Sequence, residues 1–140
     1  MPRVAAVDLG TNSTRLTERF LRSDPPTADE LAAAGAHVAG VLPALDVRAA
    51  VGVAGTVDQL EALAGRLTPE TVAVQLERLA SLPVAARARI PGLEPARAPV
   101  IVGGAVIVAE VLRRYRLESL AFSVRDLLDG VALELGGSSR

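Results

Sequence analysis

The sequence has no cysteine, no lysine and a single histidine. The absence of cysteine excludes disulfide bonds and thiolate nucleophiles, and with one histidine it also excludes zinc sites built from cysteine and histidine. Any bound metal ion must therefore have oxygen ligands. The 15 basic residues are all arginine and face 16 acidic residues, which leaves a net charge of −1. This balance provides no general field for nucleic acid or for an anionic membrane, so neither is expected as a partner.

Aromatic residues are also scarce, at 2% of the chain, although half of the residues are apolar. Leucine, valine and alanine must therefore fill the core of what is expected to be one compact domain. The longest apolar run, residues 100–112, is shorter than the roughly 20 residues that a membrane helix needs, and Glu110 interrupts it. It is expected to be a buried helix. The first apolar segment begins at Val4, which leaves no room for a signal peptide, so a cytoplasmic location is expected.

Three short apolar segments, residues 4–8, 49–53 and 120–123, lead into small residues and then into helical patterns. Strands that alternate with helices predict an α/β fold, here a small parallel sheet with flanking helices. In such a sheet ligands bind outside the carboxyl ends of the strands. The residues that follow the three segments are therefore expected to form one site.

Two helices have clear signals at their first residues. Thr27 and Glu30 have the spacing of a capping box, and the apolar stripe that follows ends at either Val41 or Leu42. Thr68, followed by Pro69, begins another helix, which should end before Pro83.

Glycine appears inside one predicted helix and ahead of another. Gly103 and Gly104 lie within the apolar helix expected over residues 100–115, where they indicate either close packing or a nearby ligand. A loop is expected over residues 91–99, which contain four prolines or glycines, and a helix is expected to follow the glycine turn "GVAGT".

Two glycine turns are the candidate phosphate-binding elements. In "VDLGTNS" the backbone N–H groups and hydroxyls of the turn can approach an anion, and the site residues proposed there are Asp8, Gly10, Thr11, Asn12 and Ser13. In "GVAGT" the candidates are Gly52, Gly55 and Thr56, where small residues would admit a phosphate chain close to the backbone. For both turns the alternative is a plain strand–helix turn that needs small residues for packing.

Other polar residues carry weaker signals. His37 is expected to be a packing residue because no second histidine or carboxylate accompanies it in the pattern. Asp126 and Asp129 follow the last predicted strand, where they would face the site or stabilise the first turn of a helix. The cluster of Arg113, Arg114 and Arg116 would meet a polyphosphate or complement a helix C-terminus.

These segments together resemble the exopolyphosphatase and guanosine pentaphosphate phosphatase (Ppx/GppA) family of the actin-like ATPase superfamily. "VAAVDLGTNSTRL" is similar to the family's first phosphate motif, "RLTERFLRSDPPTADEL" to a helix of its second domain, and "IVGGAVIVAEVLRRYRLESLAFSVRDLLDG" to its closing helix–strand–helix. The resemblance implies a partial ribonuclease H-like domain. It also implies Mg²⁺, held through Asp8, and polyphosphate or guanosine pentaphosphate as substrate.

The chain departs from the family pattern by its length. Residues 1–16 resemble the start of the first domain and residues 17–140 the second domain, so the chain passes from one "RL" motif to the next at Arg15 and Leu16. The segment between them, which in the family carries a catalytic glutamate and a second phosphate motif, is missing, and Pro99 replaces an expected aspartate. We therefore expect either an impaired phosphoanhydride hydrolase or a non-catalytic module. A homodimer formed through apolar surface left exposed is the expected association.

Overall fold

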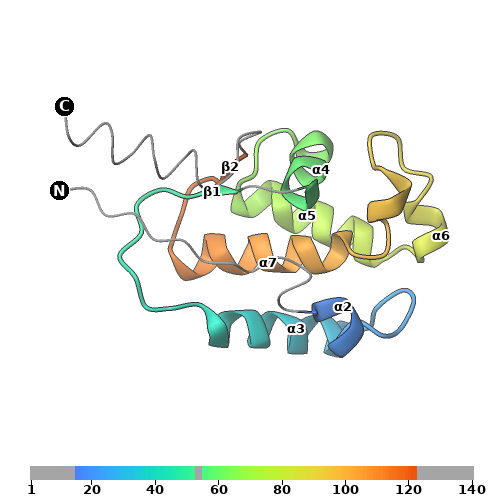
Figure 1. Ribbon diagram of the computed structural model, residues 1–140, viewed down its shortest axis with the longest axis horizontal. Coiled ribbons are helices and arrows are strands. Elements are labelled where there is room, and N and C mark those ends of the chain that lie inside the picture. Colours follow the sequence, from blue (N-terminus) through green and yellow to red (C-terminus); the bar gives the residue numbers. More distant parts are fainter. Residues whose placement is uncertain (1–14, 53–54, 123–140) are drawn as a thin grey trace.

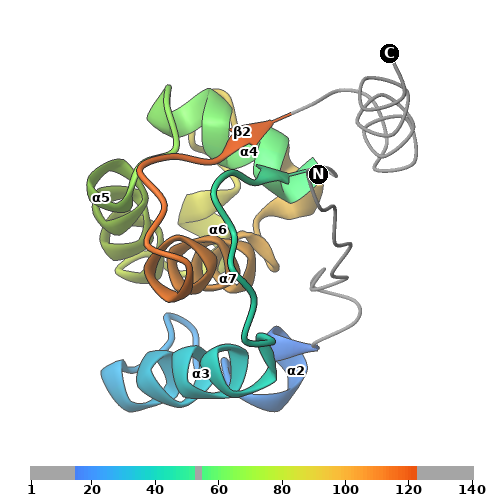
Figure 2. The ribbon, with the colours of Figure 1, turned by 90° about the vertical axis from the view of Figure 1, so that its left-hand side faces the viewer.

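The helix α7 (Ile101–Arg114) is the centre of the structure, a computed structural model that describes residues 15–52 and 55–122. It packs against α3 (Ala28–Val41), α4 (Gly55–Ala64) and α5 (Pro69–Ala80). α3 lies on one side of α7, and α4 and α5 lie on the other (Figures 1 and 2). The sequence predicted this buried helix over residues 100–115, and the prediction is confirmed.

The layer below α7 consists of α3 and the short helix α2 (Leu16–Arg19). Thr27 and Glu30 form the predicted capping box, in which the Thr27 hydroxyl accepts from the Glu30 N–H and the Glu30 carboxylate accepts from the Thr27 N–H. The apolar stripe of α3 ends at Leu42, which is buried, and not at Val41, which is 46% exposed.

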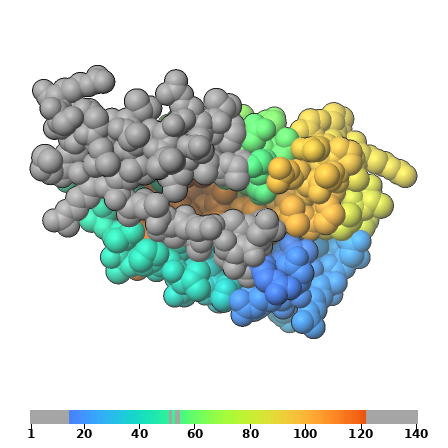
Figure 3. Space-filling view, in the orientation of Figure 1, coloured from blue at the N-terminus to red at the C-terminus, as the bar shows by residue number. Residues whose placement is uncertain are grey.

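The upper layer contains α4 and α5. α5 begins as predicted, with Thr68 as its N-cap, Pro69 at its first position and a capping box between Thr68 and Thr71. In the space-filling view only a narrow orange strip of α7 is visible, with the blue-to-teal lower layer below it and green and gold residues at its right-hand end (Figure 3). The buried hydrophobic residues are leucine, valine, isoleucine and alanine, as the composition predicted.

Two strands lie at the end of the molecule near the C-terminus of α7. β1 (Val51–Gly52) pairs in parallel with β2 (Ala121–Phe122), with Val51 opposite Ala121. Each strand is shorter than the segment that the sequence predicted. The third expected strand, residues 4–8, lies outside the described residues, so the three-stranded parallel sheet stays a prediction and the described part of the chain is mostly helical.

Two short helical elements stand where the sequence predicted no helix. α6 (Val84–Arg87) follows Pro83, and the 3₁₀ helix η1 (Pro95–Arg97) lies inside the segment expected to be a loop. Arg87 is buried and donates to the carbonyls of Leu82 and Ala98, at 3.0 and 2.6 Å, which joins α6 to the residue after η1.

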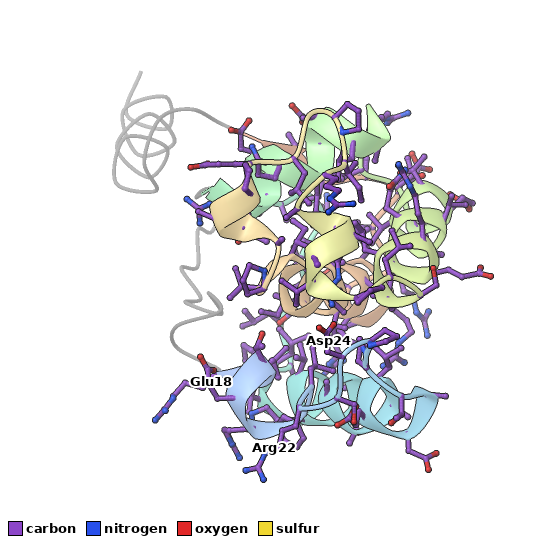
Figure 4. All side chains as sticks on the ribbon, turned by 90° about the vertical axis from the view of Figure 1, so that its right-hand side faces the viewer. Glu18, Arg22 and Asp24 are labelled. Atoms are coloured by element: carbon purple, nitrogen blue, oxygen red, sulfur yellow. The ribbon has the colours of Figure 1, made fainter. Side chains whose placement is uncertain are left out.

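Asp24 connects this region to the lower layer. Its Oδ1 accepts from the Val84 N–H at 2.8 Å and lies 3.5 Å from the Arg87 guanidinium. Figure 4 shows Asp24 between the α2 region, where Glu18 and Arg22 are labelled, and α6. No helix in the described part of the chain is long and apolar enough to cross a membrane.

Candidate functional site

The glycine turn after β1 is a crowded junction between β1, α4 and β2. A Cβ added at Gly52 would lie 2.8 Å from Val57 and 3.2 Å from Leu120, so a larger residue would force the helix away from the strands. Glycine is therefore required there by packing. This agrees with the alternative from the sequence, a strand–helix turn that needs small residues for packing. The same close packing brings the first turn of α4 to the carboxyl end of β1.

Thr56, near the start of α4, packs against α7. A Cβ added at Gly104 would overlap the Thr56 methyl group, so α7 and α4 can pack here in this way only with glycine at position 104. Of the two roles that the sequence left open for Gly104, the described residues show close packing. The contact fixes the N-terminus of α4 against the central helix.

Arg97 brings a positive charge to the same N-terminus. Its guanidinium occupies the space that a side chain at Gly55, the first residue of α4, would fill. Gln59 of α4 accepts from the backbone N–H of Glu94 at 2.5 Å, which ties the start of η1 to α4 and places Arg97. The only ion pair recorded for Arg97 among the described residues is a loose one, 3.9 Å from Glu94.

This arrangement has the chemistry of an anion-binding corner. The first N–H groups of a helix carry a partial positive charge and need acceptors, and Arg97 adds five donors in a planar fork beside them. The Arg97 side chain is 39% exposed, so solvent or a ligand can reach it. A phosphate group satisfies both kinds of donor at once.

The sequence did not predict Arg97 as a site residue. It lies in a segment that prolines and glycines mark as a loop, 42 positions after Gly55 by residue number, and nothing local distinguishes it from the other arginines. Its role follows from two tertiary features, the η1 turn and the Gln59 bond. The one signal in the sequence that could have indicated Arg97 as a site residue is its position between a proline turn and an apolar helix.

Several predicted site residues cannot be placed. Gly52 ends β1 and Gly55 and Thr56 begin α4, whereas the first glycine turn and the two aspartates after the last strand lie outside the described residues: Asp8, Gly10, Thr11, Asn12, Ser13, Asp126 and Asp129. Within residues 15–52 and 55–122 no three metal-ligating side chains are grouped closely enough to hold a metal ion.

His37 and Arg113, which the sequence also singled out, have local contacts. The His37 ring lies 5.1 Å from the Phe20 ring and near the Arg19 guanidinium, so it packs where α2 meets α3. Arg113 pairs with Glu110, and this carboxylate raises the pKa of the Arg113 guanidinium. Both contacts are structural.

Comparison with known proteins places the chain in one family. Residues 3–138 match the model of the Ppx/GppA phosphatase family. The chain is 37% identical over 158 residues to exopolyphosphatase 2 of Mycobacterium tuberculosis, a match that covers 96% of this chain and 50% of that protein.

Solved structures give the same result. The crystal structure of the Aquifex aeolicus Ppx/GppA phosphatase is similar with a TM-score of 0.71 and 26% identity, covering 86% of this chain and 45% of that one. An exopolyphosphatase-like protein is similar with a TM-score of 0.74 and 29% identity, covering 90% and 48%. The chain thus spans about half the length of the relatives that it matches. The chain belongs to the Ppx/GppA phosphatase family.

Proposed function

We propose that this chain binds the terminal phosphates of inorganic polyphosphate at the corner formed by Gly52, Gly55, Thr56 and Arg97, as part of an exopolyphosphatase-type site. The observation that carries the proposal is the Arg97 guanidinium at the N-terminus of α4, in a chain whose mycobacterial relative is an exopolyphosphatase. The reaction that such a site serves is the attack of water on a terminal phosphoryl group, with release of orthophosphate.

The described residues have a defined part in this reaction. The α4 N–H groups and Arg97 would bind and orient phosphate oxygens, and their charge opposes the negative charge of the phosphoanhydride. Glycine at position 55 leaves room for the guanidinium beside the backbone, and both sets of donors would then bind one phosphate group. Guanosine pentaphosphate, the other substrate that the family resemblance implies, has the same terminal phosphate chemistry.

The proposal includes a second wall contributed by the first glycine turn, with Asp8, Gly10, Thr11, Asn12 and Ser13 at the phosphate and Asp8 as the Mg²⁺ ligand. Carboxylate oxygen is the donor that Mg²⁺ prefers, and Mg²⁺ bound there would neutralise phosphate charge. The described residues form no metal site of their own. This part of the proposal therefore rests on the resemblance around Asp8.

The test is calorimetric binding of a medium-length polyphosphate to the wild-type chain and to Arg97→Gln. Because Arg97 is partly exposed and its ion pair is loose, the substitution should leave the fold intact and weaken binding on the order of tenfold. Arg78→Gln, on the exposed face of α5, removes the same charge away from the corner and serves as the control. Equal loss in both variants would show that polyphosphate binds through general charge, and the proposal would be wrong.

A further inference from the structure

A basic groove lies where β1 and β2 begin, at the end of the strands opposite the glycine turn. Because β1 and β2 are parallel, the segments that lead into them meet at one edge, and the groove between these segments has a volume of about 540 Å³. Its lining comes from residues 47–50, which precede β1, and from residues 116–119 and 121, which lead into and begin β2. The Ala121 N–H donates to the Ala50 carbonyl at 3.4 Å, which confirms that the two segments adjoin.

The groove has an excess of positive charge. Arg48 and Arg116 line it, and Arg66 donates to the hydroxyl of Ser119, a third lining residue, at 3.3 Å. These three arginines are exposed, and none has a carboxylate within 4.0 Å among the described residues. Among the described residues of the lining, Glu118 is the one acidic side chain. For a chain with a net charge of −1, this is a local concentration of cations.

Arg116 has a backbone conformation that favours glycine. Its φ of 52° lies in the left-handed region, and it follows the C-cap of α7, where the Leu117 N–H bonds to the Leu112 carbonyl and the Arg116 N–H to the Arg113 carbonyl. Glycine is the usual residue in this motif because any side chain there is strained. Because strained residues are often found at ligand sites, the strained backbone of Arg116 beside the groove suggests that its side chain binds a ligand.

We propose that this groove binds an oligophosphate group, with Arg48 and Arg116 as its direct ligands and Arg66 as an additional source of positive charge. Arginine forks match phosphate oxygens, and several donors from different segments can hold two adjacent phosphates. The volume falls within the range of ligand pockets, so the groove has room for a base and sugar beside the phosphates. The groove is separate from the corner at Gly55, and its role does not depend on the function proposed for that corner.

The test is a titration of ¹⁵N-labelled full chain followed by NMR, with pyrophosphate as one probe and GDP as the other. Binding in the groove should move the amide signals of residues 47–50 and 116–121. If GDP binds on the order of tenfold more tightly than pyrophosphate, the ligand is a nucleotide, and equal affinity identifies a polyphosphate segment; either result supports the proposal. Unchanged groove signals with both probes would overturn it.

Three variants test whether the arginines of the groove bind the probes. Arg48→Gln and Arg116→Gly should each weaken probe binding on the order of tenfold, the loss expected for one charge-assisted contact. Arg116→Gly should also raise the melting temperature, because glycine relieves the left-handed strain, so the lost binding cannot come from unfolding. Arg78→Gln should leave the groove titration unchanged. Loss of binding in Arg78→Gln equal to that in Arg116→Gly would refute the assignment.

Discussion

Arg87 shows how a single buried charge can organise a region that has little regular structure. Burial lowers the pKa of its guanidinium and Asp24 raises it, and the guanidinium donates to the carbonyls of Leu82 and Ala98. An arginine stays charged despite such a shift. Its removal would leave two carbonyls without donors and a cavity at the junction of α6 and η1.

We therefore expect Arg87→Ala to lower the free energy of unfolding by about 3 kcal/mol. Asp24→Asn should cost about 1 kcal/mol, because Asp24 is half exposed and the amide oxygen can still accept from the Val84 N–H. Urea unfolding of both variants gives the two values. A loss in Asp24→Asn as large as in Arg87→Ala would mean that the ion pair, and not the carbonyl bonds, holds Arg87.

Glu30 links the stability of the lower layer to pH. Its pKa is lowered chiefly by the Thr27 N–H, and the Ser23 and Arg22 N–H groups add to the effect. A carboxyl whose pKa is lower in the folded state stabilises the fold above its unfolded pKa, and this contribution is lost as pH falls through the folded pKa.

The melting temperature of the wild type should therefore exceed that of Glu30→Gln at neutral pH, and the two should converge as the pH falls through the lowered pKa of Glu30 and the carboxyl protonates. Thermal unfolding over a pH series measures this. Glu77→Gln, on the exposed face of α5, is the control for removing one surface carboxylate. A constant difference between the wild type and Glu30→Gln across the series would contradict the prediction.

At the scale of elements, the contact between α4 and α7 offers a direct test of packing. Gly104→Ala removes a helix-weakening glycine, a gain of about 1 kcal/mol. The added methyl would overlap Thr56, and overpacking of this kind typically costs about 1–3 kcal/mol, so we expect net destabilisation. Gly40→Ala, in α3 with no atom within 4 Å of the new Cβ, should instead stabilise the protein by up to about 1 kcal/mol.

The rescue variant is Gly104→Ala with Thr56→Ser, because serine keeps the hydroxyl and removes the methyl group that would clash. Chemical unfolding of the two single variants and the double variant gives the coupling free energy. The double variant should recover most of the lost stability. Independent, additive effects would show that the clash is relieved by a shift of α4.

The elements that could be predicted from the sequence are those with local signals. The caps at Thr27 and Thr68 determine where α3 and α5 begin, and an apolar run determines α7. α6 and η1 were missed because they are short and depend on distant partners, such as the bond from Asp24 to the Val84 N–H. Arg97 was missed for the same reason. Its position depends on contacts with α4 that no local pattern records.

At the scale of the whole molecule, the chain spans about half the length of its relatives. Surface that a longer relative covers would then be exposed, and Val41, Leu45 and Val74 are the large apolar side chains exposed in the described part. We propose that the chain self-associates through such surface. Sedimentation at rising concentration should show a dimer, and a clean monomer at high micromolar concentration would contradict this.

The length of the chain relative to its relatives also affects what can be expected of catalysis. Phosphoryl transfer needs a nucleophile positioned in line and charge neutralised from several sides, and the corner at Gly55 and Arg97 supplies donors from one side. Loss of a catalytic carboxylate alone costs on the order of 10²–10⁴ in rate. The resemblance to the family implies that this chain lacks the catalytic glutamate and the second phosphate motif.

We therefore expect phosphate release from polyphosphate and from guanosine pentaphosphate to stay near background in the presence of Mg²⁺, although binding persists. Release of orthophosphate over time for the wild type, Asp8→Ala and Arg97→Gln measures the first quantity, and calorimetry on the same three proteins measures the second. Asp8→Ala should weaken only the Mg²⁺-dependent part of binding, whereas Arg97→Gln should weaken binding with and without Mg²⁺. Robust release by the wild type that Asp8→Ala abolishes would show that one chain, or a pair of chains, forms a complete site. If a pair of chains forms the site, activity should rise more steeply than protein concentration, whereas a site formed by one chain should give activity proportional to it.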